Sequence, residues 1–392
     1  MNREFSVGAV VKAIKSVIKK MRAVPLHEPC FEGNEWNYVK DCLDSGWVSS
    51  VGQYVDRFEN MLSEFCGIPY VVATMNGTAA LHISLLLSGV EPGDEVLVPA
   101  MTFVATANAV SYCGATPHFA DSEEKTLGVD PARLNDYLKE ISEMRFGECF
   151  NRKTGRRIKA LVPMHTFGHP VDMDPLMEVT ARYKLTVVED AAESLGSLYK
   201  GRHTGTIAPL GVLSFNGNKV VTTGGGGAIL TSDRELGRLA KHLTTTAKQP
   251  HRWAFNHDMV GYNYRLPNIN AALGCAQLEQ VPRFIHQKRR LAVCYQEVVK
   301  PLPGIECIQE PDFAWSNYWL NTLLLDVNYR DQRDAVLEAM NDAGLTSRPV
   351  WTLLNRLPMY QTCPSMELNI AESLEQRLIN IPSSPSLKDG HE

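Results

Sequence analysis

Short β-rich runs alternate with helical periods from about residue 34 to residue 232. This alternation is typical of an α/β fold in which helices cover a mostly parallel central sheet. Helical spacing of apolar residues predicts helices between the strands, for example over 78–87 and 173–183. The predicted strands lie at 70–74, 95–98, 116–120, 158–163, 185–189, 211–215 and 227–231.

The pattern changes after Pro267, where helical spacing continues to about Val299 before Pro301 interrupts it. A smaller segment follows, with strands predicted near 317–327 and 347–350 and helices at 330–343 and 371–379. We therefore expect an N-terminal basic amphipathic helix at 1–22 and a large α/β domain at 23–265. A long linking helix and a small C-terminal α+β domain are expected at 266–392.

Composition excludes several classes of protein. The chain has 392 residues, of which 44% are apolar and 21% charged, as in ordinary folded proteins. Its 39 basic and 44 acidic side chains give a net charge of −5, which argues against a generic nucleic-acid surface. Nine cysteines without a C-x-x-C pair suit a reducing cytoplasm and predict no metal site. No run of about eighteen apolar residues occurs, so we expect no membrane span.

Residues 1–22 carry six Lys or Arg and one Glu, a net charge of +5. Such a stretch could lie on a membrane surface, but we favour a helix that covers the main body of the protein. Lys12 and Lys15 interrupt the apolar run, so the stretch is not a signal peptide. The apolar residues expected to face the body are Val7, Val10, Val11, Ile14, Val17 and Ile18.

Lys219 follows a predicted strand and precedes a glycine-rich turn. It ends the run from Ser214 and is followed by four successive glycines at 224–227. Glycines allow the backbone to lie close to a bound group, since they have no Cβ. Taken alone, Lys219 would be interpreted as a solvated lysine in a turn, because most lysines are only solvated.

Residues that could bind a ligand also follow two other predicted strands. Asp190 lies at the carboxyl end of a predicted parallel strand, where open α/β sheets bind ligands, although it could instead cap a helix. Its neighbour Glu189 should point to the opposite face of the sheet. The turn Asn76-Gly77-Thr78 leads from a strand into a helix N-terminus, whose free N–H groups favour a phosphate.

Together these features fit pyridoxal phosphate. Its phosphate needs backbone amides, its ring nitrogen a carboxylate such as Asp190, and its aldehyde a lysine amine such as Lys219. An aromatic side chain should cover the ring, and Phe103 follows a strand at the same edge of the sheet. Phe103 could also be an ordinary core residue.

The chain resembles the DegT/StrS family of sugar-nucleotide aminotransferases, which are fold-type I enzymes that use pyridoxal phosphate. The resemblance covers about residues 24 to 385 and is closest to the LegC-type subgroup. It implies a large domain with a mostly parallel sheet between helices, followed by a smaller domain. The matching motifs lie at 46–52, 76–80, 162–168, 189–193, 214–227, 261–265, 348–351 and 357–360.

The resemblance also implies residue roles. Lys219 would form the Schiff base, Asp190 would pair with the ring nitrogen, and Glu193 would lie beside the ring hydroxyl. Phe103 would stack on the ring, and His165 would lie near the wall of the site unless it is a structural histidine. The residues implied for the phosphate are Gly77, Thr78 and Ser214, with Asn263 or Arg265 from the partner subunit of a homodimer with shared active sites.

The resemblance further implies the reaction. Glutamate would donate the amino group, and a nucleotide-linked 4-keto-6-deoxy sugar would accept it. The subgroup suggests UDP-linked 4-keto-6-deoxy-N-acetylglucosamine, on a route to a bacterial surface glycan or nonulosonate. Another keto-sugar or a cyclitol is an alternative acceptor, and a non-catalytic cofactor- or sugar-nucleotide-binding regulator is an alternative of another class. Candidate substrate contacts are Trp47, Ser49, His165, Lys200, Arg202, His203, Arg252 and Arg348.

Overall fold

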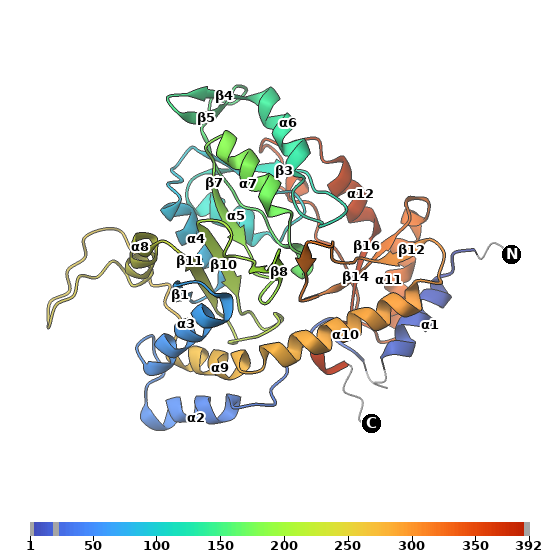
Figure 1. Ribbon diagram of the computed structural model, residues 1–392, viewed down its shortest axis with the longest axis horizontal. Coiled ribbons are helices and arrows are strands. Elements are labelled where there is room, and N and C mark those ends of the chain that lie inside the picture. The colour runs from blue at the N-terminus through green and yellow to red at the C-terminus, as the bar shows by residue number, and fades with distance from the viewer. Residues whose placement is uncertain (1–3, 19–22, 388–392) are drawn as a thin grey trace.

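A seven-stranded sheet forms the centre of the larger part of the molecule (Figure 1). The computed structural model describes residues 4–18 and 23–387. The strand order is β1-β11-β10-β7-β6-β2-β3, and β11 runs antiparallel to the other six strands. Six strands therefore end at the same edge. Their bounds are β1 Tyr70–Thr74, β2 Glu95–Pro99, β3 Thr116–Ala120, β6 Ile158–Leu161, β7 Thr186–Asp190, β10 Leu210–Ser214 and β11 Gly227–Thr231.

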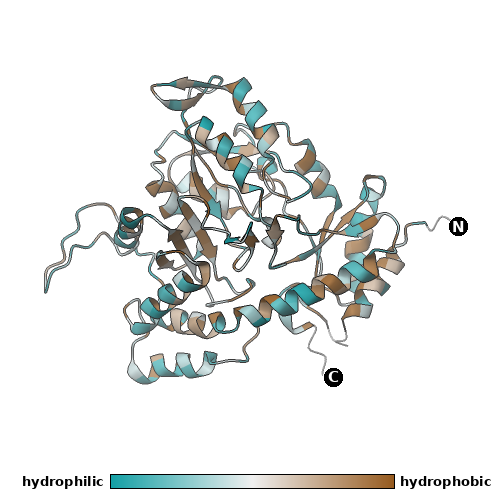
Figure 2. Ribbon diagram, in the orientation of Figure 1, coloured by the Kyte–Doolittle hydropathy of each residue, from teal (hydrophilic) through white to brown (hydrophobic). Residues whose placement is uncertain are grey.

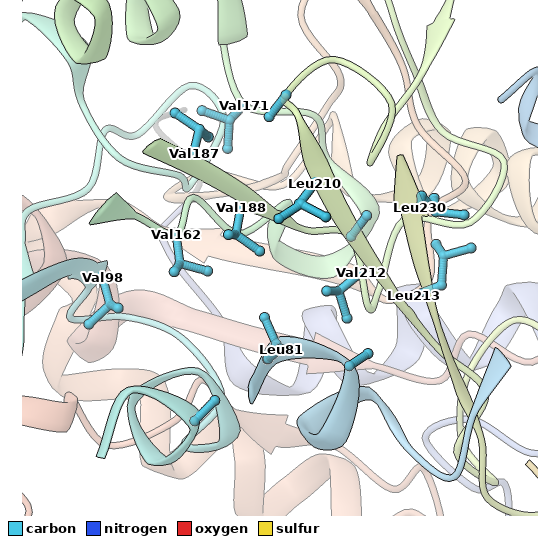
Figure 3. Close-up of a cluster of buried hydrophobic side chains, with 14 of the residues drawn as sticks. Leu81, Val98, Val162, Val171, Val187, Val188, Leu210, Val212, Leu213 and Leu230 are labelled. Atoms are coloured by element: carbon cyan, nitrogen blue, oxygen red, sulfur yellow. The ribbon is translucent and has the colours of Figure 1, made fainter. Parts of the chain in front are cut away.

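Helices cover both faces of this sheet, as the alternating sequence predicts (Figure 1). Helix α4 is buried along most of its length and packs on β10, β11 and β7. Figure 3 shows Leu81 of α4 among valine and leucine side chains of the central strands. Each such buried side chain contributes about 1.5–3 kcal/mol. The helices are α2 Glu35–Ser45, α3 Gln53–Cys66, α4 Gly77–Leu87, α5 Ala105–Tyr112, α6 Pro131–Ile141, α7 Met173–Arg182, α8 Arg234–Thr244 and α9 Asn268–Leu278.

The smaller part is built on a four-stranded antiparallel sheet in the order β12-β14-β16-β15. Its last strand along the chain, β16, was expected to be the end of a helix, and that prediction is wrong. The run 378–381 is wholly apolar or buried, and a short run of this kind does not distinguish a strand from a helix. The elements are β12 Ile305–Cys307, β14 Asn321–Leu325, α11 Arg333–Asp342, β15 Arg348–Pro349, α12 Asn369–Arg377 and β16 Leu378–Ile381.

The expected long helix after Pro267 is two helices. Helix α9 ends at Leu278 and packs on α2 and α3, and α10 (Val281–Val299) continues into the smaller part. Pro282 lies in the first turn of α10, where its missing N–H costs nothing. A proline at this place marks the start of a new helix, which the spacing of apolar residues does not show.

Short elements complete the structure. Four of the strands form two small hairpins that the sequence did not predict. The remaining elements are β4 Ser142–Arg145, β5 Glu148–Asn151, β8 Leu198–Tyr199, β9 Arg202–His203, β13 Ala314–Trp315 and the 3₁₀ helices η1 Thr166–Gly168, η2 Val327–Gln332, η3 Leu354–Arg356 and η4 Pro385–Leu387.

Helix α1 (Val7–Val17) packs on the smaller part of the molecule. Val10, Ile14 and Ile18 are buried in one cluster with residues of α10, α11 and β14. Figure 2 shows apolar and polar residues alternating along α1 and α10, as expected for helices with one face covered. The apolar face of α1 is therefore covered by protein, but by the smaller part and not the main body. Residues 1–3 and 19–22 of the expected helix lie outside the described residues.

No helix in the described ranges, 4–18 and 23–387, is long and apolar enough to cross a membrane.

Candidate active site

A pocket of about 380 Å³ lies at the carboxyl edge of the large sheet. Asp190 ends β7 and Ser214 ends β10, and the turns after β1 and β2 complete the near walls. The pocket therefore lies where open α/β sheets bind ligands. Its polar and aromatic lining includes Asn76, Thr78, Phe103, Thr106, Asp190, Glu193, Ser214, Asn216, Asn218, Lys219, Trp319 and Trp351.

Lys219 projects into this pocket from the turn after β10. Its Nζ lies 3.3 Å from Glu193 Oε1 and 3.9 Å from the centre of the Trp319 ring. The Trp319 indole N–H donates to the carbonyl of Asn218 at 2.7 Å, which fixes the ring beside the turn. The lysine is mostly buried between a carboxylate and an aromatic face, unlike a solvated turn lysine.

The N-terminus of α4, where the sequence predicts a phosphate seat, lies at the pocket. Asn76 caps the helix, and its side chain accepts from the Ala79 N–H at 2.7 Å. The first N–H groups of the helix have no partner within it and lie at the pocket. Glycine is needed at 227, because a Cβ there would lie 2.5 Å from the Asn76 carbonyl carbon. At Gly77 a Cβ would approach Ser214 to 3.0 Å, so helix and serine lie close together.

Asp190 and Glu189 point to opposite faces of β7, as predicted. Asp190 lines the pocket and accepts hydrogen bonds from the Thr106 hydroxyl at 2.8 Å and the Ala192 N–H at 3.2 Å. Burial raises the pKa of the Asp190 carboxyl, and these hydrogen bonds oppose the shift. A cation placed in the pocket would stabilise the ionised form of this carboxylate.

Glu193 shares the pocket with Lys219. Its second oxygen accepts from the Phe167 N–H at 2.9 Å. Burial raises the pKa of the Glu193 carboxyl to about 7, although the nearby Lys219 opposes the shift. The family resemblance implied a place beside a ring hydroxyl for this residue, and the structure brings it to the pocket.

The raised pKa of Glu193 predicts a pH-dependent stability. Between its ordinary value of 4.5 and about 7, the folded chain binds a proton that the unfolded chain releases. Glu193 therefore makes its full contribution to the free energy of unfolding below pH 4.5, and this contribution is lost as pH rises to about 7. The loss is about 3 kcal/mol for a shift of this size. We expect chemical denaturation of the cofactor-free protein to show this decline and Glu193→Gln to flatten it.

Glu178→Gln is the control for this prediction, because Glu178 lies exposed on α7. It should leave the pH dependence unchanged. An equal decline in the wild type and in Glu193→Gln would show that Glu193 does not titrate in this range.

Aromatic side chains form the open wall of the pocket. Phe103 lines it and is half exposed, as expected for a ring that covers a ligand and not for a core residue. Trp351 lies 6.5 Å from Phe103 and 5.1 Å from Phe167, measured between ring centres. Trp319 and Trp351 come from the smaller part of the molecule, so both parts build the site.

His165 is a structural histidine. Its Nδ1 accepts from the Val171 N–H at 3.1 Å, so Nε2 carries the proton and donates to Glu189 at 3.1 Å. Glu189 also accepts from the N–H groups of Gly205, Ile207 and Ala208. The network is fully buried on the face away from the pocket, so the prediction of a substrate contact at His165 is wrong.

The structure places the other substrate candidates outside the pocket lining. Trp47 and Ser49 lie in the exposed loop before α3, where their carbonyls accept hydrogen bonds from Asn268. Arg202 lies in the β8–β9 hairpin and donates to the carbonyl of Thr206. Arg348 is exposed on β15, an edge strand.

Three further candidate substrate contacts also lie outside the pocket lining. Lys200 pairs with Asp174, and His203 is buried, with its Nε2 accepting from the Gly196 N–H. Arg252 is exposed above the ring of Trp253.

Asn263 and Arg265 also lie outside the lining of their own chain's pocket. Asn263 is exposed, and Arg265 Nη2 lies 3.4 Å from its side-chain oxygen. Arg265 Nε is buried and has no hydrogen-bond partner among the described residues.

A larger hollow of about 1100 Å³ runs along α10 between Phe65, Arg289 and Trp315. Neither Lys219 nor Asp190 lines this hollow. Among the described residues that line it, one ion pair is present, between Arg289 and Glu310. We assign the active site to the smaller pocket, because the reactive groups converge there.

Comparison with known proteins agrees with this geometry. The family model described as the DegT/DnrJ/EryC1/StrS aminotransferase family matches residues 29–392. The chain belongs to this family. It is a pyridoxal phosphate-dependent aminotransferase, as the sequence predicts.

The similarity to named relatives covers nearly the whole length of the aminotransferase. It is 37% identical to GDP-perosamine synthase from Escherichia coli O157:H7, over 94% of this chain and 95% of that one. It is 36% identical to GDP-perosamine synthase from Caulobacter vibrioides, over 92% and 93%. The crystal structure of the aminotransferase TlmJ from Streptoalloteichus hindustanus matches with a TM-score of 0.83 at 28% identity, over 94% and 95%.

The pocket of this aminotransferase fits pyridoxal phosphate. An amine, a carboxylate and a helix N-terminus face one volume of about 380 Å³, so each part of the cofactor has a complementary group. Within the described residues no cluster of His, Cys, Asp and Glu could bind a metal ion.

Sequence reasoning missed Thr106 and Trp319. Thr106 lies one turn after Phe103, so its place near the pocket could have been inferred from helical spacing. Trp319 lies one hundred residues after Lys219, and no local pattern connects the two.

Proposed function

We propose that the aminotransferase moves an amino group from glutamate to a nucleotide-linked 4-keto-6-deoxy sugar. The convergence of Lys219, Asp190 and the α4 N-terminus on one pocket carries this proposal. The names of the relatives support a nucleotide sugar as acceptor. Because the lysine, the carboxylate and the α4 N-terminus all line one pocket, we do not retain the alternative of a non-catalytic regulator.

Each residue has a distinct part in the proposed reaction. Pyridoxal phosphate, when bound, supplies an electron sink and carries the amino group. The Lys219 amine would hold the cofactor through its aldehyde and, once free, would serve as the base that carries a proton. The Asp190 carboxylate would stabilise a protonated ring nitrogen, and Phe103 would cover the ring. Ser214 and the first amides of α4 would bind the phosphate.

Glu193 keeps the Lys219 amine within the pocket. Its carboxylate is 3.3 Å from the amine. Since the carboxyl's pKa is about 7, it can exchange a proton near neutral pH. We propose that it lies beside the cofactor's ring hydroxyl when the cofactor is bound.

Two acceptor sugars are candidates. Resemblance to the LegC-type subgroup favours UDP-linked 4-keto-6-deoxy-N-acetylglucosamine, on a route to a bacterial surface glycan or nonulosonate. The GDP-perosamine synthases at 36–37% identity favour a GDP-linked 4-keto-6-deoxy sugar instead. Either would be used in the cytoplasm, where nucleotide sugars are made.

Product analysis tests this function. Glutamate should bleach the yellow holoenzyme, and one of the two keto sugars should restore its colour and yield a 4-amino sugar. Bleaching by glutamate without restoration by any nucleotide-linked keto sugar would refute the proposed acceptor. A cyclitol ketone serves as the third substrate in the comparison.

We further propose a homodimer with shared active sites. The chain between α8 and α9 forms an arm that extends away from the body (Figure 1). Trp253, Phe255 and Val260 of this arm are 74%, 77% and 81% exposed. The loop before α3 also exposes Trp47 and other apolar side chains. Exposed apolar surface of this extent favours an interface with a second copy.

In such a dimer, Asn263 or Arg265 would reach the phosphate of the partner subunit's cofactor. We expect a mixture of inactive Lys219→Ala and an inactive Asn263→Ala/Arg265→Ala protein to regain part of the activity after subunit exchange. Each mixed dimer would contain one intact site. Exchange confirmed by native mass spectrometry without any return of activity would contradict the shared site.

A further inference from the structure

Trp351 carries an indole N–H group that the protein itself does not use. The side chain lines the active-site pocket and is half-buried. Its N–H forms no hydrogen bond with residues 4–18 or 23–387, and it is not completely buried. Trp319, the other tryptophan of the pocket, differs, because its N–H donates to the carbonyl of Asn218. Indole N–H groups usually find a partner when they are buried, so the donor of Trp351 is available to a ligand.

The ring of Trp351 is backed by another aromatic ring. Phe167 is fully buried, its ring centre lies 5.1 Å from that of Trp351, and the two planes are inclined by 32°. Phe167 does not line the pocket, so Trp351 lies between Phe167 and the pocket. The indole therefore presents an aromatic surface to whatever the pocket binds.

The backbone after Trp351 is attached to both parts of the molecule. The Leu354 N–H donates at 2.9 Å to the carbonyl of Ala100, which directly follows β2. The Leu353 N–H donates to Glu375 Oε1 of α12 at 3.1 Å. The segment that carries the indole is thus held in place before a ligand binds, which reduces the entropy that binding must offset.

The charges of the pocket indicate which substrate this surface suits. Among the described residues that line the pocket, Lys219 is the one cation, and Asp190 and Glu193 are the carboxylates. The face of an aromatic ring is electronegative, so it disfavours the carboxylates of glutamate. A hexose is neutral, its C–H groups can pack on an indole face, and its oxygen atoms can accept a hydrogen bond from the N–H.

The position of Lys219 indicates which part of a nucleotide sugar would meet Trp351. The carbon that receives the amino group belongs to the hexose and must lie near Lys219. The base is separated from the hexose by a ribose and two phosphates. The group that shares a pocket of about 380 Å³ with Lys219 and Trp351 is therefore the hexose.

We propose that Trp351 is a specificity-determining residue that packs on the hexose of the acceptor and donates a hydrogen bond to one of its oxygen atoms. This inference rests on the proposed function, because it assigns Trp351 to the second substrate of that reaction. Trp351 should matter for the keto sugar and not for glutamate. The two half-reactions should therefore respond differently when the indole is replaced.

The test is Trp351→Leu, which keeps an apolar side chain and removes both the aromatic face and the N–H. With the holoenzyme, the rate at which glutamate bleaches the cofactor should stay within about twofold of wild type. The KM for the nucleotide-linked keto sugar should rise by roughly tenfold or more, as expected for a lost hydrogen bond and a lost ring contact. Trp351→Phe, which keeps a ring without the N–H, should recover part of this loss.

A binding measurement separates contact with the hexose from contact with the nucleotide. UDP and GDP are the nucleoside diphosphates of the two candidate acceptors, and neither contains the hexose. The one that matches the accepted sugar should bind the wild-type and Trp351→Leu holoenzymes with equal affinity in calorimetric titrations. A loss of affinity for the nucleoside diphosphate as large as the rise in KM would place the base on the indole and overturn the proposal.

Trp315→Leu is the matched control. Trp315 also belongs to the smaller part of the molecule and is partly exposed, but it packs on Arg289 in the hollow along α10 and does not line the active-site pocket. It should change neither half-reaction. Thermal unfolding and cofactor content should be measured for every variant. If Trp351→Leu does not fold, Trp351→Phe carries the test, because loss of the N–H alone should raise the KM for the sugar roughly threefold or more.

The outcomes separate the inference from the function. A wild-type enzyme that transaminates the sugar, with the folded Trp351 variants equal to it, overturns the role of Trp351 alone. Equal loss in both half-reactions, or in Trp315→Leu as well, also overturns it. A wild-type enzyme that accepts no nucleotide sugar overturns the proposed function and this inference together.

Discussion

Lys219→Ala should lose at least roughly 10⁴-fold in kcat, because one side chain both binds the cofactor and moves the proton. The fold should persist, since the amine contacts only Glu193 and the face of Trp319 among the described residues. The measurement is steady-state turnover with glutamate and the accepted keto sugar, together with the thermal unfolding temperature.

Lys200→Ala controls for the loss of a lysine. Lys200 forms an exposed ion pair with Asp174, and such pairs contribute little. Its turnover should stay within about twofold of wild type. Substantial turnover in Lys219→Ala would mean that another amine carries the reaction.

Asp190→Asn should reduce kcat by roughly 10³-fold, because the amide cannot stabilise a protonated ring nitrogen as a carboxylate does. The amide can keep both neighbours, with its oxygen accepting from Ala192 and its nitrogen donating to Thr106. Since burial already disfavours the charge of Asp190, the free energy of unfolding should change little. Activity, urea denaturation and oligomeric state should be measured on the same preparation.

Glu189→Gln is the matched variant at the adjacent position. Glu189 accepts from three backbone N–H groups and from His165, and it does not line the pocket. The free energy of unfolding should fall by about 2–3 kcal/mol, while the remaining folded enzyme keeps its kcat. If Asp190→Asn and Glu189→Gln lost the same amounts of kcat and of unfolding free energy, the assignment of the two side chains to opposite faces of β7 would be wrong.

The sequence predicted the central part of the site because that part is local. Asp190 and Ser214 end their strands and Gly77 begins the helix that follows β1, and parallel strands bring their carboxyl ends to one edge. Alternation along β7 also predicted that Asp190 and Glu189 point to opposite faces of the sheet. Glycines at 224–227 predicted close approach of the backbone to a bound group, whereas the structure shows that Gly227 lies against the backbone of Asn76.

What the sequence could not predict depends on contacts between distant residues. The ring of Trp319 contacts Lys219 across one hundred residues of sequence. Lys288 donates to the carbonyl of Trp319 and also to that of Ser383, which is 95 residues away. His165 lies in a motif near the site, yet its ring turns to the other face, where Glu189 accepts a hydrogen bond from its N–H group. The β16 strand resembles a helix end in sequence, because burial on both faces removes the alternation that marks a strand.

The central claim is that Lys219 binds pyridoxal phosphate in the pocket beside Asp190. Borohydride reduction of the holoenzyme followed by peptide mass mapping tests it most directly, because reduction makes the bond between lysine and cofactor permanent. The cofactor mass should appear on the peptide that contains Lys219 and on no other. A label on a different lysine, with Lys219 unmodified, would contradict the account.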